Sequence, residues 1–174
     1  MTPDLPSMFE LPFRTAFTVA AVIGAATVLL AGSPEPARAS PPKVITFTQV
    51  ACQILEAENG VNHNFETTRR ADCERINAQT RTKRLAEARP IRLKPGSYIF
   101  RVTNMDVPYE LGFWLRDKDY DWRNPIHKLT KVAVLGGGLM SGQTRDYIVE
   151  LKPGRYIYSC PLNTTPDYEL IVAE

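Results

Sequence analysis

Alternation of apolar and polar positions dominates the chain from residue 43 onward. KVITFTQV (43–50) is rich in β-branched and aromatic residues and predicts a first strand. PYELGFWLR (108–116) places every second side chain, from Tyr109 to Leu115, on one face, as in a strand with one buried side. Apolar runs punctuated by turn residues predict further strands within 89–104, 131–142, 144–163 and 168–174. The pattern therefore predicts a mainly β fold, a Greek-key antiparallel β-sandwich.

The phrase LKPG occurs twice, at 93–96 and 151–154, and each copy is followed two residues later by a tyrosine. Proline followed by glycine favours a tight type II turn, so each copy should form a corner before an aromatic strand. Two copies are too few for a solenoid and indicate matching turns of a sandwich.

The interval 51–88 lacks this alternation and predicts one short helix, around 67–79, because Cys73, Ile76 and Thr80 recur at helical spacing. Residues 69–92 contain eight Arg or Lys against three acidic residues. The stretch is either a solvated helix and loop or a basic surface for lipid headgroups or an acidic partner. On the second interpretation the candidate contact residues are Arg69, Arg70, Arg81, Lys83 and Arg84.

The N-terminal part contains an uncharged segment from Thr15 to Pro34 with the apolar core AFTVAAVIGAATVLLAG. This length is just sufficient to cross the hydrocarbon of a bilayer, so residues 1–33 are expected to hold a transmembrane or signal helix. The ARA sequence at 37–39 before Ser40 fits signal peptidase, but Arg14 is the only basic residue ahead of the apolar core. A retained signal-anchor and a cleaved signal both remain open, and the weak basic region favours the anchor.

The stretch PEPARASPP (34–42) predicts a proline-rich linker, which leaves 43–174 as the main domain. With either fate of the N-terminal helix, this domain is expected on the periplasmic, extracytoplasmic side of a membrane. If the helix is retained, it also provides contact with membrane lipid.

Three cysteines are consistent with that compartment. In an oxidising environment a Cys52–Cys73 disulfide is the expected pairing, and its loop is worth about 3 kcal/mol on the chain-entropy account. The alternative is three unpaired buried thiols. With the disulfide formed, Cys160 is left over.

Several function classes have little support in the sequence. A net charge of +2 is too small to favour nucleic acid as a partner. Gly-x-Ser-x-Gly, His-Glu-x-x-His and phosphate-loop patterns do not occur, and the chain has only two histidines. We therefore expect a protein that is not an enzyme.

Two stretches within 90–174 resemble the cupredoxins, the blue-copper electron-transfer proteins. VTNMDVPYELGFWL (102–115) is similar to the family stretch that leads to the first copper histidine, and YIYSCPLNTTPDYELIV (156–172) to the stretch that carries the ligand cysteine. The resemblance places Tyr109 at the first histidine, Cys160 at the thiolate and Asn163 at the second histidine. Pro166 and Asp167 stand where an axial methionine is expected.

A blue-copper site needs two imidazoles, a thiolate and a weak axial ligand, and only the cysteine is present. The resemblance thus implies a cupredoxin-like sandwich without a cofactor. The alternative is a copper site that recruits His63 and His127 to Cys160.

The function expected from this resemblance is that of a non-catalytic, membrane-anchored accessory subunit of an electron-transfer complex, photosynthetic or respiratory. Its partners would be the other subunits, contacted through aromatic residues beside a charged loop: Trp114, Tyr120 and Trp122. These aromatic side chains could instead only cover the end of the sandwich. The alternative function is a periplasmic copper-binding electron-transfer protein with a non-standard site at Cys160.

Overall fold

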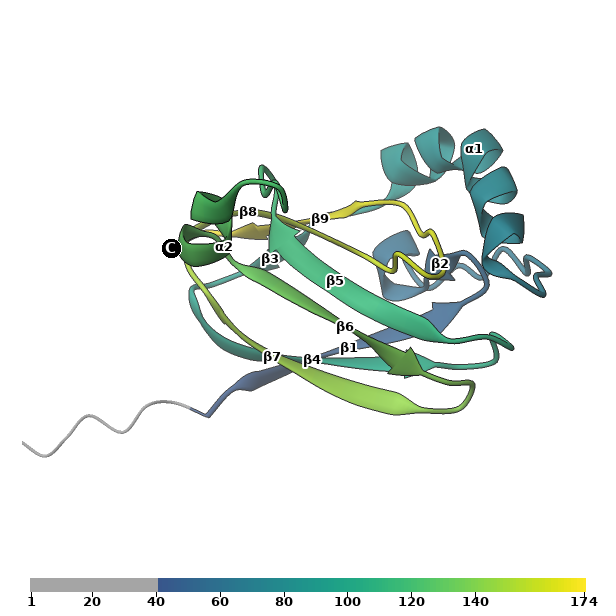
Figure 1. Cartoon of the computed structure of the whole chain (residues 1–174), viewed down its shortest axis with the longest axis horizontal. Helices are drawn as coiled ribbons and strands as arrows, with labels where there is room; N and C mark the ends of the chain where they lie inside the picture. The colour runs from purple at the N-terminus through teal and green to yellow at the C-terminus, as the bar shows by residue number, and fades with distance from the viewer. Residues whose placement is uncertain (1–40) are drawn as a thin grey trace, which may run out of the picture. The chain divides into compact units, whose positions relative to one another are not determined.

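The computed structural model describes residues 41–174, which form two facing β-sheets (Figure 1). One sheet has the strand order β2 (Gln53–Ile54), β1 (Lys43–Val50), β4 (Gly96–Asn104), β7 (Thr144–Leu151). The other has the order β3 (Ile91–Leu93), β9 (Tyr168–Val172), β8 (Gly154–Ser159), β5 (Leu111–Asp117), β6 (Ala133–Leu139). The predicted mainly β sandwich is confirmed. The expected N-terminal helix and nearly all of the expected linker lie outside the described residues.

Aromatic rings from both sheets form the centre of the core. The ring of Phe47 stacks on Phe100 with centroids 5.7 Å apart and on Tyr158 with centroids 4.8 Å apart. Phe113 lies 5.8 Å from Phe100 and belongs to the apolar face predicted for 108–116. Such rings bury large areas and prefer offset or tilted contacts, so they fix the spacing of the two sheets.

Two strand pairs differ from the antiparallel arrangement expected from the sequence. β1 pairs with β4 in parallel, and so does β3 with β9. A parallel pair needs a long crossover, and residues 51–95, which connect β1 to β4, include the main helix. All other pairs of the described strands are antiparallel.

The repeated LKPG phrase positions a tyrosine on each following strand. Tyr98 donates its hydroxyl hydrogen to the carbonyl of Lys94, and Tyr156 does the same to Lys152, both at 2.8 Å. Each tyrosine thus ties a buried strand to its own turn. Of the two turn glycines only Gly96 takes a positive φ (142°), well above the roughly +80° of a type II turn, so the prediction of type II turns is wrong for both copies.

The helix of the crossover, α1 (Arg70–Glu87), is longer than the one predicted at 67–79. Its first turn begins where the Asp72 carboxylate accepts hydrogen bonds from the backbone N–H groups of Thr68 and Arg69. No glycine or proline interrupts the chain before Pro90, so the helix continues past the predicted end.

Two shorter helical segments were not predicted. η1 (Glu56–Glu58) follows β2, and α2 (Pro125–Thr130) follows β5. In α2, proline occupies the first turn and the Asn124 side chain accepts from the N–H of Ile126 at 3.0 Å, a common start for a helix. No helix among residues 41–174 is long and apolar enough to cross a membrane.

Candidate functional site

The three positions that the resemblance assigns to copper ligands meet at one end of the sandwich. The Tyr109 hydroxyl lies 3.3 Å from Oδ1 of Asn163, and the backbone N–H of Asn163 donates to Sγ of Cys160 at 3.2 Å. Tyr109 precedes β5, and the other two residues lie in the turn after β8. The three residues that the resemblance assigns to copper-ligand positions are therefore neighbours in space.

The Asn163 side chain has its hydrogen-bonding capacity taken up by the protein. Its Nδ2 donates to the carbonyl of Val50 at 2.8 Å, and its Oδ1 accepts from the N–H of Cys52 at 2.9 Å. The same oxygen accepts from the Tyr109 hydroxyl. A fully buried amide thus joins the end of β1 to the turn that carries Cys160.

The Cys160 thiol is fully buried at the end of β8. Its sulfur accepts hydrogen bonds from the backbone N–H groups of Gly112 and Asn163, at 3.3 and 3.2 Å. Burial raises the pKa of this thiol in spite of these donors, so the neutral form is favoured. An unreactive structural cysteine has these properties.

The disulfide expected between Cys52 and Cys73 is present and lies against this cluster. Sγ of Cys73 is 3.4 Å from the Tyr109 hydroxyl and 3.3 Å from Oδ1 of Asn163. Nearby on α1, Asn77 donates to the carbonyl of Thr164 at 2.5 Å. Helix and disulfide therefore cover the end of the sandwich where the three positions meet.

The residues at this place do not fit a copper ion. A phenol and a hydrogen-bonded amide stand where two imidazoles are needed, so only the Cys160 sulfur of the usual ligand set is present. Among residues 41–174, no three His, Cys, Asp or Glu side chains are grouped as metal ligands would be.

The two histidines lie elsewhere. His63 contacts the carboxylate of Glu58 through Nε2 at 2.7 Å, and His127, in α2, accepts from the N–H of Asp121 through Nδ1 at 3.0 Å. The alternative ligand set of Cys160, His63 and His127 is therefore not brought together.

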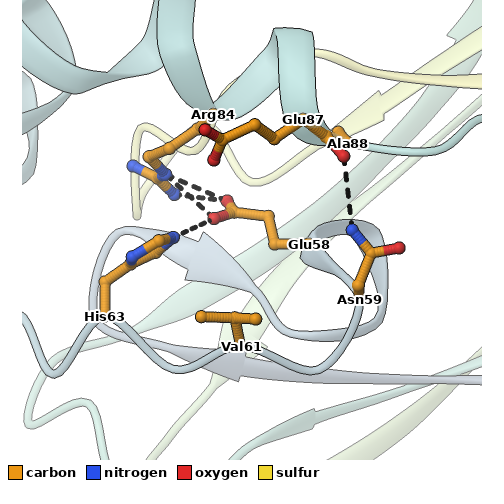
Figure 2. A pocket seen from close by; sticks show the side chains of 7 residues that line it. All are labelled: Glu58, Asn59, Val61, His63, Arg84, Glu87 and Ala88. Atoms are coloured by element: carbon orange, nitrogen blue, oxygen red, sulfur yellow. Dashed lines mark hydrogen bonds and ion pairs between the residues drawn. The ribbon is translucent and has the colours of Figure 1, made fainter.

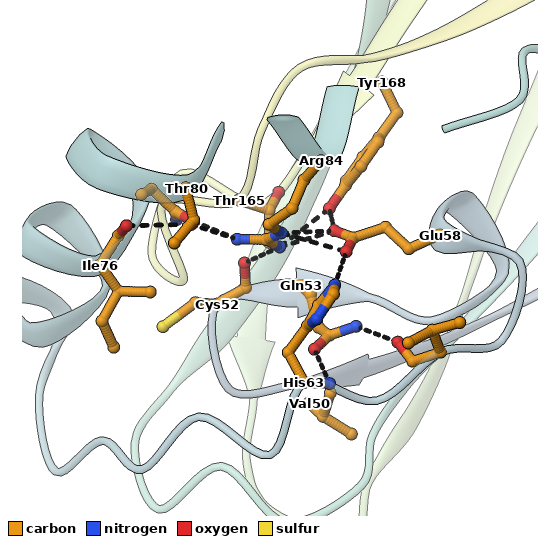
Figure 3. A network of polar contacts seen from close by, with 12 residues as sticks. Val50, Cys52, Gln53, Glu58, His63, Ile76, Thr80, Arg84, Thr165 and Tyr168 are labelled. Carbon is orange, nitrogen blue, oxygen red and sulfur yellow. Dashed lines mark hydrogen bonds and ion pairs between the residues drawn. The ribbon is translucent and has the colours of Figure 1, made fainter. Parts of the chain in front are cut away.

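A buried ion pair beside this cluster links α1 to η1 (Figure 3). Arg84 donates from Nη2 to Oε1 of Glu58 at 2.6 Å and to the carbonyl of Cys52 at 2.9 Å. Tyr168 also hydrogen-bonds Oε1 of Glu58, and Asn77 accepts from the Arg84 guanidinium. Arg84 is only 3% exposed, so its assignment as a surface contact residue is wrong. It lies on the same helix face as Cys73, and that face packs on the sandwich.

The electrostatics of Glu58 follow from these partners. Burial alone would raise the pKa of its carboxyl group, but hydrogen bonds from Arg84 and Tyr168, with the Arg84 charge, bring that pKa below its ordinary value. The pocket at this place is small, about 70 Å³, with Glu58 between Arg84 and His63 (Figure 2). The charged groups are satisfied by one another, as expected of a structural link.

The three aromatic residues proposed for contacts differ in exposure. Trp114 is half-buried, with the guanidinium of Arg116 stacked 3.7 Å from its ring and Tyr120 edge-on at 6.4 Å. Trp122 is 59% exposed. Beside Trp114 is a hollow of about 380 Å³, with mostly apolar walls that include Leu135, Pro161 and Leu162.

The other basic residues proposed for contacts are exposed on or beside α1. Arg70 and Lys83 form ion pairs with acidic residues one turn further along the helix, and Arg69 lies close to Asp72. Arg81 has no ion-pair partner among the described residues. Exposed pairs of this kind contribute little stability, so these side chains remain accessible to a partner.

No protein-family model matches the sequence, and no curated protein matches it. Among solved structures, the chain is similar to Auracyanin B, with 11% identity over 78% of this chain and 91% of that chain and a TM-score of 0.43. A multi-copper oxidase from Pediococcus acidilactici matches at 11% identity over 82% of this chain, with a TM-score of 0.37. Fet3p, a multicopper oxidase that functions in iron import, matches at 16% identity over 91% of this chain, with a TM-score of 0.34.

The chain spans 28% and 37% of the lengths of these two oxidases. The two facing sheets and the meeting of Tyr109, Cys160 and Asn163 beside β8 define the architecture. The domain is a mainly β, two-sheet sandwich.

Proposed function

We propose that this protein is a non-catalytic accessory subunit of a membrane-bound electron-transfer complex, photosynthetic or respiratory, and that it acts through a metal-free cupredoxin-like domain. One observation carries the proposal. The positions that correspond to copper ligands lie together. Asn163, however, is hydrogen-bonded to the backbone of Val50 and Cys52, and the Tyr109 hydroxyl contacts Sγ of Cys73 in the disulfide. The fold keeps its architecture there without a ligand set for copper.

The absence of a suitable catalytic constellation in residues 41–174 supports a non-catalytic role. Among residues 41–174, the ion pair with both members buried is Glu58–Arg84, and every charged atom in it has a partner in the protein. The thiol of Cys160 is fully buried, and burial raises its pKa. Neither feature offers a nucleophile or a free acid–base pair to a substrate.

The surface supports a role in protein contacts. Trp122 is exposed, Trp114 borders an apolar hollow, and α1 presents accessible arginines. Aromatic and arginine side chains are the residues that most often carry binding energy at protein interfaces. A domain with such surfaces is suited to holding other subunits together.

The membrane and electron-transfer parts of the proposal have separate support. Residues 15–33 are uncharged and of membrane-spanning length, and the Cys52–Cys73 disulfide is typical of an oxidising compartment. Both features favour a domain on the periplasmic side. The association with electron transfer rests on the resemblance to cupredoxins, which is an argument from fold.

Co-purification tests the proposal. A tagged chain, expressed at its native level, is extracted with a mild detergent and run on a native gel, and co-migrating proteins are identified by mass spectrometry. We expect stoichiometric recovery of integral membrane subunits with redox cofactors. Arg81 is exposed and has no ion-pair partner within the described part of the chain, so Arg81→Glu should retain the fold and recover less of these subunits. A chain that migrates alone in mild detergent would contradict the accessory role.

A further inference from the structure

The start of β1, where the chain enters the domain, marks one end of the sandwich. In the strand register, Lys43 lies beside Tyr98, Gly96 beside Leu151, and Asp117 beside Tyr156. The start of β1, both LKPG turns and the segment 118–131 that follows β5 therefore lie together, as Figure 1 also shows. We call this the chain-entry end. α1 and the Cys160 turn lie at the opposite end (Figure 1).

The segment 118–131 presents large apolar side chains to solvent. Trp122 is 59% exposed, Ile126 is 64% exposed and Leu129 is 88% exposed. Ile126 and Leu129 are three residues apart in α2, so they share one helix face. No residue of α2 is buried, and the core of the sandwich does not use these side chains. An exposed apolar cluster of this kind is typical of a surface that binds a partner or a membrane.

The chain-entry end carries a moderate excess of basic residues, many of them paired with acidic ones. Basic residues there are Lys43, Arg92, Lys94, Lys118, Arg123, Lys128, Lys131, Lys152 and Arg155. Acidic residues there are Asp117, Asp119, Asp121, Glu150, Glu169 and Glu174. Several are paired with each other, including Lys131 with Asp119 at 2.5 Å and Lys118 with Glu169 at 2.9 Å. Binding at this end must therefore depend on the apolar side chains more than on net charge.

The short connection to the N-terminal segment favours a lipid surface as the partner of Trp122, Ile126 and Leu129. Residues 34–42 separate the apolar segment from β1, and an extended chain of that length reaches at most about 30 Å. With residues 15–33 in a bilayer, the linker length limits the chain-entry end to at most about 30 Å from the lipid surface. Trp122 lies in the turn before α2, and Ile126 and Leu129 lie on α2. Such apolar and aromatic residues with adjacent Lys and Arg are the composition of segments that lie in the headgroup region.

We propose that the segment 118–131 docks into the boundary between lipid headgroups and acyl chains, with Trp122, Ile126 and Leu129 as the inserted side chains. The inference rests on the membrane anchoring included in the proposed function. It also assigns the two ends of the domain different partners. The basic residues of α1 face away from the bilayer and are available to an acidic protein surface instead of headgroups.

Depth-dependent fluorescence quenching tests the docking. The full chain is reconstituted into phosphatidylcholine–phosphatidylglycerol vesicles, with or without lipids brominated near the headgroup. The Trp114→Phe variant leaves Trp122 as the only tryptophan. Its emission should shift to the blue and lose intensity in brominated vesicles, with little change as salt is raised. The reciprocal Trp122→Phe variant leaves Trp114, which is stacked under Arg116, and should show no such loss.

A matched pair of substitutions separates docking from general surface effects. Leu129→Asp in the Trp114→Phe chain should restore most of the lost emission, because a charge is costly at the acyl boundary. Ile148→Asp changes another exposed apolar residue (69%), on the outer face of β7, and should leave the quenching unchanged. Vesicle flotation is measured on every sample. A chain that floats while Trp122 is unquenched overturns the docking alone, and a chain that does not float overturns the anchoring beneath it.

Discussion

Replacement of Asn163 by alanine tests how much the hydrogen bonds of its buried side chain contribute to the stability of the fold. The substitution removes the donor to the Val50 carbonyl and the acceptor for the Cys52 N–H. Cys52 is fully buried and its N–H has no other recorded partner among the described residues, while Tyr109 retains a contact to the Thr67 hydroxyl at 3.4 Å. The loss therefore falls mainly on two backbone groups.

The magnitude follows from these two groups. An orphaned buried N–H costs about 1–3 kcal/mol, and a lost hydrogen bond to a carbonyl costs about 0.5–1.5 kcal/mol. We therefore expect Asn163→Ala to lower the free energy of unfolding by about 2–4 kcal/mol, a large part of the 5–15 kcal/mol typical of a domain. A smaller effect would require the turn to move and recover both bonds.

Urea unfolding of the full chain, with the disulfide intact and tryptophan emission as the probe, measures this difference. The midpoint should fall while the slope against urea stays constant. Asn62→Ala is the control, since Asn62 is exposed and its side-chain oxygen bonds only to the N–H of Asn64. A loss for Asn163→Ala no larger than that of Asn62→Ala would refute the reasoning.

Three further predictions concern the core, the buried ion pair and the disulfide. Tyr158→Phe should leave stability equal or higher, because the Tyr158 hydroxyl is buried without a partner among the described residues. Tyr156→Phe should lower the free energy of unfolding by about 1 kcal/mol, because it loses the hydrogen bond to the Lys152 carbonyl. Thermal unfolding of both variants compares them. Because the folded pKa of Glu58 is lowered, its contribution is present above the unfolded pKa of about 4.3 and is lost as pH falls through the folded pKa. The free energy of unfolding should therefore fall less steeply with decreasing pH for Glu58→Gln than for the parent. An equal pH dependence in both proteins would contradict the lowered pKa of Glu58. Removing the Cys52–Cys73 disulfide, with both cysteines changed to serine, should cost about 3 kcal/mol in urea unfolding, and an unchanged midpoint would count against it.

Most of the strands could be predicted from the sequence because each carries its own local pattern. KVITFTQV matches β1 and TRDYIVEL matches β7 residue for residue. The LKPG phrase also indicated two equivalent corners, although the hydroxyl-to-carbonyl bonds that secure them depend on the side-chain geometry of Tyr98 and Tyr156. The parallel pairing of β1 with β4 could not be predicted, because it depends on the path of a long crossover.

The buried role of Arg84 was missed because a run of basic residues normally lies in solvent. A local clue was present, since Cys73, Asn77, Thr80 and Arg84 recur at helical spacing and form one face of α1. Extending the helix past residue 79 would have placed Arg84 on the same face as the disulfide. Its partner Glu58 is distant in sequence, and no pattern along the chain identifies that contact.

The candidate site was found through resemblance, since neither spacing nor composition brings Tyr109 to Asn163. The cluster of exposed apolar residues in 118–131 was missed apart from Trp122, because Ile126 and Leu129 look like ordinary core positions. The Asn-Pro pair at 124–125 was a recognisable helix start that would have indicated α2. Exposure itself depends on what the rest of the fold leaves uncovered.

Titration of the purified chain with Cu(II), followed by visible absorbance, tests the central claim most directly. The account predicts no stoichiometric intense band, because Asn163 and Tyr109 stand in place of the imidazoles and are hydrogen-bonded within the protein. The Cys160→Ala variant should give the same spectrum as the parent. An intense band that saturates at one copper per chain and disappears in Cys160→Ala would contradict the metal-free interpretation.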